Sequence, residues 1–224
     1  MYVPVFFAIA AAALDLVAVA MGWHDARWVT KLLPAVLLAV AVLRTPGAPR
    51  AFGYGLLLAA LGDGQLLRTG SGNDGFLFGM IAFALMHVEY IIGFASLGDG
   101  PGLVRRVPWL AIPYAMAALT LDILILPTAG TFAVPVAVYS VLLAAMAIAA
   151  LNAAGRLKDA RAARMLAGGA LVFMLSDTLL ALAKFWPGFF LTGTTAELAI
   201  CATYFVAQIA IATGAIAALE PTAS

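Results

Sequence analysis

The sequence predicts an all-α, polytopic membrane protein, and two observations support this prediction. The 224 residues are 65% hydrophobic and only 10% charged, whereas a soluble domain carries about a quarter charged residues. The apolar residues form long continuous runs, which match neither the polar stripe of soluble helices nor the short alternating segments of membrane barrels. We therefore expect one transmembrane domain over residues 1–224, integral to the cell membrane.

Eight apolar runs approach the roughly 17–25 residues that a membrane-spanning helix needs. Short segments with glycine and proline separate them, as turns require. Pro113 and Pro135 fall inside runs, where membrane helices tolerate a proline kink. The eight predicted transmembrane helices are residues 3–21, 29–43, 51–67, 75–97, 107–126, 132–152, 165–185 and 194–219.

The distribution of lysine and arginine predicts that both termini are cytoplasmic, because cytoplasmic loops are enriched in these residues. The loops on the predicted cytoplasmic side carry eight: Arg44, Arg50, Arg105, Arg106, Arg156, Lys158, Arg161 and Arg164. The opposite side carries four: Arg27, Lys31, Arg68 and Lys184.

Two aspartates within apolar runs, Asp63 and Asp177, occupy corresponding places in a weak internal repeat. The offset of 114 residues that aligns them also aligns several glycines, leucines, phenylalanines and tyrosines. The repeat predicts two weakly similar four-helix halves, about residues 1–100 and 101–224, with a site between them. Chance similarity between helices rich in leucine and alanine is the alternative.

Charged side chains are costly in hydrocarbon, so those inside the spans are candidates for function. Asp63 and Asp177 are the candidate catalytic residues. The candidate substrate-binding residues are Lys31, His87, Tyr90, Asp122, Lys184, Glu197, Tyr204 and Gln208. Most of these lie in the non-cytoplasmic half, as expected of a cavity open to one side. Each also has a structural interpretation, as a helix anchor, a packing residue or a lysine that reaches the headgroups.

Metal and nucleic-acid functions find no support in the sequence. Cys201 is the single cysteine, which excludes an intramolecular disulfide and a cysteine-built metal site. The two histidines, His24 and His87, are too few for a histidine-rich metal centre. We expect no cofactor and no nucleic-acid partner, and the sequence does not predict the oligomeric state.

Several short motifs follow one another along almost the whole chain. They are Lys31 with Pro34; Leu61-Gly62-Asp63 with Leu66-Leu67; Gly79, Phe83, His87 and Tyr90; Ser176-Asp177 with Leu180-Ala181 and Lys184-Phe185; and Tyr204 with Gln208. Their order and spacing resemble the YhhN-like lysoplasmalogenase family of eight-span membrane proteins. The resemblance implies a membrane hydrolase that cleaves the vinyl ether bond of lysoplasmalogens to a fatty aldehyde and glycerophosphoethanolamine or glycerophosphocholine. It implies that Asp63 and Asp177 are essential, and that the partners are a lysophospholipid substrate and membrane lipids.

Vinyl ether hydrolysis suits a pair of carboxyl groups. Protonation of the distal alkene carbon gives an oxocarbenium ion, which water captures as a hemiacetal that collapses to aldehyde and alcohol. Burial and mutual repulsion leave one carboxyl of a pair protonated and the other ionised, a division of work that glycosidases also use. We expect both aspartates to face one apolar pocket as an acid and base pair, and the sequence does not decide which is the acid.

The main alternative from another class is a small-molecule or proton-coupled transporter, since repeats and membrane carboxylates suit alternating access. An intramembrane aspartyl protease is disfavoured, because Leu61-Gly62-Asp63 and Leu175-Ser176-Asp177 match its motifs poorly. A zinc-dependent amidase needs more histidines. A transporter requires polar groups that reach both faces, whereas a hydrolase requires one cavity closed on one side.

Overall fold

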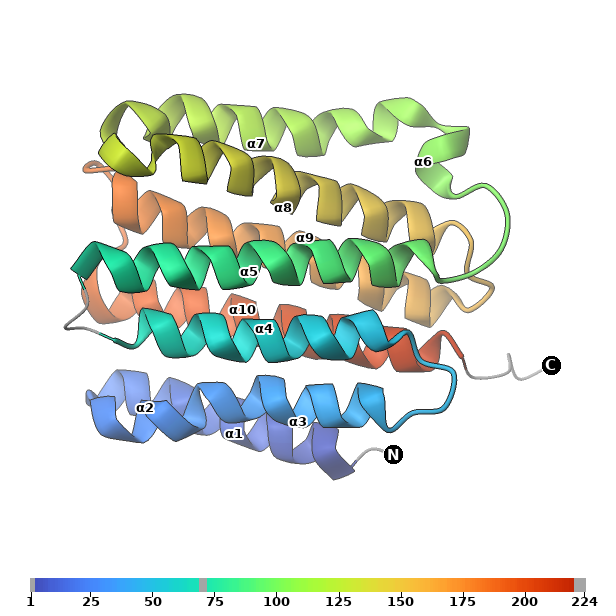
Figure 1. The fold of residues 1–224 in the computed structure, drawn as a ribbon, viewed down its shortest axis with the longest axis horizontal. Coiled ribbons are helices and arrows are strands. Elements are labelled where there is room, and N and C mark those ends of the chain that lie inside the picture. The colour runs from blue at the N-terminus through green and yellow to red at the C-terminus, as the bar shows by residue number, and fades with distance from the viewer. Residues whose placement is uncertain (1–2, 69–71, 220–224) are drawn as a thin grey trace.

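The protein is an all-α bundle whose long helices run side by side (Figure 1). The computed structural model describes residues 3–68 and 72–219. The α-helices are α1 (Val3–Met21), α2 (His24–Thr30), α3 (Leu32–Leu43), α4 (Arg50–Leu66), α5 (Gly72–Ala95), α6 (Leu103–Arg106), α7 (Ile112–Ile125), α8 (Ala133–Ala154), α9 (Ala160–Phe185) and α10 (Gly193–Ala217).

Within the described residues, seven helical segments are long and apolar enough to cross a membrane. They are Val3–Met21, His24–Leu43, Asn73–Ala95, Pro108–Thr128, Gly130–Ala154, Ala160–Phe185 and Gly193–Ala217. Large apolar side chains such as Phe6, Ile123 and Val141 are exposed on the outside of the bundle, which is stable only against lipid or another apolar surface. The chain is therefore a polytopic integral membrane protein.

The remaining predicted span, residues 51–67, corresponds to α4. Its 17 residues extend about 26 Å at about 1.5 Å per residue, somewhat less than a typical hydrocarbon core of about 30 Å. Helix α4 nevertheless packs between α3 and α5 as part of the bundle, and α1 begins at the end of the bundle where α10 finishes (Figure 1). Eight spans, the two similar halves and the cytoplasmic position of the termini stay predictions.

The second predicted span starts earlier than expected and is interrupted at Lys31. Pro34 lacks the N–H that an unbroken helix would donate to the Thr30 carbonyl, so α2 ends at Thr30 and α3 begins at Leu32. Arg27 and Lys31 are then buried, with exposed fractions of 4% and 7%. Both were counted on the exterior side in the prediction of orientation, but their burial suits a role inside the bundle, as expected for Lys31 and not expected for Arg27; the orientation itself stays a prediction.

The two prolines expected inside spans lie in first turns. Pro113 is the second residue of α7 and follows a 3-10 turn over Pro108–Ala111, and Pro135 is the third residue of α8. A first-turn N–H has no partner within its own α-helix, so proline there costs little. Neither residue needs to kink its helix.

Local sequence features bring the helices with the aspartates into place. A Cβ on Gly62 would lie 2.7 Å from a ring carbon of Phe83, so only glycine lets α4 approach α5 this closely beside Asp63. Asp159 caps α9, which carries Asp177, by accepting hydrogen bonds from the backbone N–H groups of the next turn. The end of the bundle where α4 begins and α5 finishes is filled by apolar side chains, including the fully buried Phe52 and Phe94.

Candidate functional site

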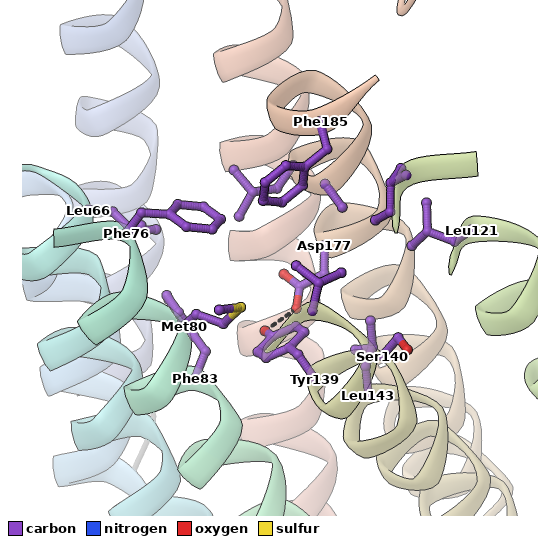
Figure 2. A pocket seen from close by; sticks show the side chains of 14 residues that line it. Leu66, Phe76, Met80, Phe83, Leu121, Tyr139, Ser140, Leu143, Asp177 and Phe185 are labelled. Carbon is purple, nitrogen blue, oxygen red and sulfur yellow. Dashed lines mark hydrogen bonds between the residues drawn. The ribbon is translucent and has the colours of Figure 1, made fainter. Parts of the chain in front are cut away.

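Asp177 lines a cavity enclosed by α4, α5, α7, α8 and α9. Figure 2 shows its carboxyl group in the middle of an apolar lining, with Phe76 and Phe185 on one side and Phe83 and Tyr139 on the other. The centres of water-sized spheres can occupy about 50 Å³ of this cavity, and roughly 10–15 Å³ is enough for one water. The cavity therefore has room for water beside a carboxyl group.

Two side chains hold the Asp177 carboxyl. The Tyr139 hydroxyl donates a hydrogen bond of 2.5 Å to Asp177 Oδ2 (Figure 2). His87 Nε2 lies 3.0 Å from the Tyr139 oxygen and 3.5 Å from Asp177 Oδ2. His87 is completely buried, and within residues 3–68 and 72–219 its Nδ1 has no hydrogen-bond partner. Asp177, Tyr139 and His87 form a compact group that we call the cavity triad.

An aromatic cluster closes one end of the cavity. The ring of Phe76 lies 5.4 Å from that of Phe132 and 5.7 Å from that of Phe185, centroid to centroid. The ammonium of Lys184 lies 5.0 Å above the Phe76 ring, within the range of a cation–π contact. Lys184 is exposed, so a cation stands at the edge of the cavity.

Asp63 is held differently. Its carboxylate accepts a hydrogen bond of 2.7 Å from the Tyr204 hydroxyl and lies 3.5 Å from the ammonium of Lys31. The Lys31 ammonium also lies over the rings of Tyr204 and Phe205, at 4.7 and 5.0 Å from their centroids. Asp63 is only 2% exposed, so a buried ion pair joins α4 to the junction of α2 and α3.

The ion pair continues into a larger charged network. Arg27 Nε donates to Asp15 over 3.2 Å, and a second guanidinium nitrogen donates to Glu197, whose side chain is 45% exposed. The thiol of Cys201 lies 3.3 Å from the Lys31 ammonium and 3.6 Å from Arg27. We call Asp15, Arg27, Lys31, Asp63, Glu197, Cys201 and Tyr204 the charged cluster.

The structure does not join the two aspartates by a direct contact. Within the described residues they share no hydrogen-bond partner, and only Asp177 lines the cavity. Phe83 lies at the boundary, because it lines the cavity and its ring is 6.0 Å from that of Tyr204. A common pocket for both carboxyl groups stays a prediction.

The remaining candidates lie around these two sites. Tyr90 donates to Gln208 in a buried pair, and the Gln208 amide contacts Met86 sulfur at 3.6 Å; none of the three lines the cavity. Asp122 accepts a bond of 2.7 Å from Ser140, which lines the cavity. Tyr90, Gln208 and Asp122 thus bond to other side chains of the bundle and do not line the cavity.

Sequence reasoning missed Tyr139 and undervalued Arg27. A tyrosine in the middle of an apolar span needs a partner for its hydroxyl, and this signal alone would have made Tyr139 a candidate. Arg27 was undervalued because the predicted span began at residue 29, whereas the helical segment begins at His24. In the part of the chain that the structure describes, no group of three histidine, cysteine or acidic side chains could hold a metal ion.

Comparison with known proteins gives consistent matches. The model of the YhhN family matches residues 26–215. Lysoplasmalogenase TMEM86A of Homo sapiens is 34% identical over 187 residues, which are 80% of this chain and 70% of that protein. Lysoplasmalogenase TMEM86B of Homo sapiens is 30% identical over 205 residues, which are 90% of this chain and 79% of that protein. No solved structure matches. Since the family model covers most of the sequence, the chain belongs to the YhhN family.

Proposed function

We propose that this protein hydrolyses the vinyl ether bond of lysoplasmalogens to a fatty aldehyde and a glycerophospho alcohol, with Asp177 and Asp63 as its two catalytic carboxyl groups. The relatives named above are lysoplasmalogenases, which supports the substrate class. The observation that carries the proposal is a carboxyl group, Asp177, in the wall of a mostly apolar cavity inside a membrane bundle.

Asp177 is placed to be the proton donor. It transfers a proton to the distal alkene carbon, and the carbon attached to the ether oxygen becomes an oxocarbenium ion. Water in the cavity adds to that carbon and returns a proton to the Asp177 carboxylate, which gives a hemiacetal. When the hemiacetal breaks down, Asp177 protonates the leaving glycerol oxygen and receives the proton of the hemiacetal hydroxyl. Asp177 is then protonated again, as at the start of the cycle.

Asp63 supplies the second carboxyl group. The ammonium of Lys31 at 3.5 Å favours the ionised form of Asp63, and a carboxylate stabilises a nearby oxocarbenium ion. Phe83 separates Asp63 from the cavity by one ring, since it lines the cavity and lies 6.0 Å from the Tyr204 ring. In this proposal Asp177 is the acid and Asp63 the anion.

The substrate headgroup would lie at the aromatic end of the cavity. Lys184 is exposed and sits over Phe76, a cavity residue, so its ammonium is free to meet the phosphate. Lys31 is less suited to this role than the sequence suggested, because it is buried against Asp63. The alkenyl chain would follow the apolar walls.

A transporter is less well supported. The charged cluster and Lys184 lie toward one end of the bundle, and Phe52 and Phe94 fill the core toward the other. Alternating access needs a polar route to both faces.

The direct test incubates the purified protein with matched alkenyl and acyl lysophospholipids and measures released aldehyde and fatty acid. The proposal expects aldehyde from the alkenyl lipid and no fatty acid from the acyl lipid. Fatty acid release, or no product from any alkenyl lipid, would contradict it.

A further inference from the structure

We propose that His87 and Tyr139 act as positioning residues that keep the acid proton of Asp177 on Oδ1, directed into the cavity, and stabilise the carboxylate left after proton transfer. This rests on the proposed function, in which Asp177 is the donor. The cavity triad determines the position of the proton through the direction of its hydrogen bonds.

The direction starts at Tyr139. A phenol has one proton to donate, and Tyr139 gives it to Asp177 Oδ2. The contact of 3.0 Å between Tyr139 and His87 Nε2 must then have the imidazole as donor. The chain of donors therefore runs from His87 through Tyr139 to Asp177.

The second ring nitrogen of His87 agrees with this direction. Nδ1 is buried and has no partner among the described residues. A proton on Nδ1 would be a buried, unpaired N–H, and such groups are rarer than bare buried acceptors. The tautomer with its proton on Nε2, which donates to Tyr139, therefore fits the site.

The position of the acid proton on Asp177 follows from its contacts. In the proposed function Asp177 donates a proton to the substrate. Its Oδ2 already accepts from Tyr139, which leaves Oδ1 to carry that proton.

The same hydrogen bonds, from His87 through Tyr139 to Asp177, favour the reaction. When the Oδ1 proton moves to the alkene carbon, Asp177 becomes a carboxylate, and the Tyr139 hydrogen bond turns into a charge-assisted one. Donation from His87 polarises the Tyr139 hydroxyl further. The triad is thus more stabilising after proton transfer than before it, which is the condition for lowering the barrier.

Asp63 shows the contrasting arrangement. It also accepts from a tyrosine, Tyr204, but its second neighbour is the ammonium of Lys31, where Asp177 has the imidazole of His87. In this proposal the second neighbour distinguishes the acid from the anion.

The test measures kcat, KM and melting temperature for variants of the triad on an alkenyl lysophospholipid. Tyr139→Phe should lower kcat about 10–100-fold, the value of a hydrogen bond to a charged group, with KM unchanged. His87→Leu should lower kcat roughly 2–10-fold. His87→Gln should stay close to wild type, because the Gln amide can still donate to Tyr139 but cannot become a cation. Tyr114→Phe, a tyrosine outside the triad, is the matched control and should behave as wild type.

The proposal is overturned by a wild-type kcat in Tyr139→Phe, or by equal losses in His87→Gln and His87→Leu. If a variant melts early, the infrared C=O band of the protonated carboxyl still decides: it should be present in wild type, absent in Asp177→Asn and shifted in Tyr139→Phe. Its absence from wild type contradicts the assignment. If wild type itself releases no aldehyde, the proposed function fails; if wild type is active and the triad variants are too, only this inference fails.

Discussion

Asp63 and Asp177 are alike in sequence and differ in environment. Each lies in an apolar helix and accepts a hydrogen bond from a tyrosine. Asp63 is buried in the charged cluster beside Lys31, while Asp177 lies beside His87, lines the cavity and has a side chain that is 12% exposed. The comparison teaches that two carboxyl groups in similar apolar helices can have different neighbours and different access to a cavity, and the roles we propose for them rest on that difference.

The largest effect is expected from a substitution of Asp177. Asp177→Asn keeps the shape but removes the acid proton, so we expect kcat for aldehyde release to fall about 10²–10⁴-fold. The melting temperature should change little, because Asp177 has no ion pair with a lysine or arginine in the described part of the chain. Asp74→Asn, an exposed aspartate at the start of α5, is the control. Near wild-type turnover in Asp177→Asn would contradict the assignment of Asp177 as the proton donor.

The second prediction concerns stability on the Asp63 side. Asp63→Asn leaves the Lys31 ammonium buried without its carboxylate, which costs about 3–5 kcal/mol when a buried pair is broken. We expect a clearly lower melting temperature in detergent. The double variant Lys31→Met with Asp63→Asn should recover most of the lost melting temperature, because neither buried charge remains.

The activity of that double variant sharpens the comparison. If Asp63 is the catalytic anion, aldehyde release stays low although the fold is restored. Recovery of both stability and activity would mean that Asp63 is only a structural anchor.

A smaller effect is expected at the boundary between the two sites. Gly62→Ala places a methyl group 2.7 Å from the Phe83 ring, and overpacking of this kind costs about 1–3 kcal/mol. The ring must move, so both the melting temperature and KM should change. Gly64→Ala, where the added carbon would meet only Leu32 at 3.6 Å, is the matched control; equal behaviour of the two variants would show that Phe83 is not tightly held.

The smallest effect is expected at the exposed edge of the charged cluster. Glu197 pairs with Arg27, but its side chain is 45% exposed, and solvent screens such pairs to about 0–1 kcal/mol. Glu197→Gln should therefore shift the melting temperature slightly, and less than Asp15→Asn, whose carboxylate is fully buried against Arg27. The reverse order would mean that Glu197 holds the cluster together.

The fold class could be predicted from the sequence because membrane helices are long, continuous apolar runs. The sequence also selected Asp63, His87, Asp177 and Tyr204, since polar groups in apolar runs are few. It could not predict which tyrosine meets which aspartate, because Tyr139 and Asp177 are 38 residues apart and their contact depends on helix packing. The burial of Arg27 could not be predicted either, since its partners Asp15 and Glu197 lie on α1 and α10.

The most direct test of the account is to run the reaction in D₂O and trap the aldehyde by reduction as it forms. One fixed carboxyl in the cavity wall should deliver deuterium to one face of the alkene, so the product should carry a single deuterium next to the former carbonyl carbon, in one configuration. Product without deuterium at that carbon, or with both configurations in equal amounts, would contradict proton delivery by Asp177.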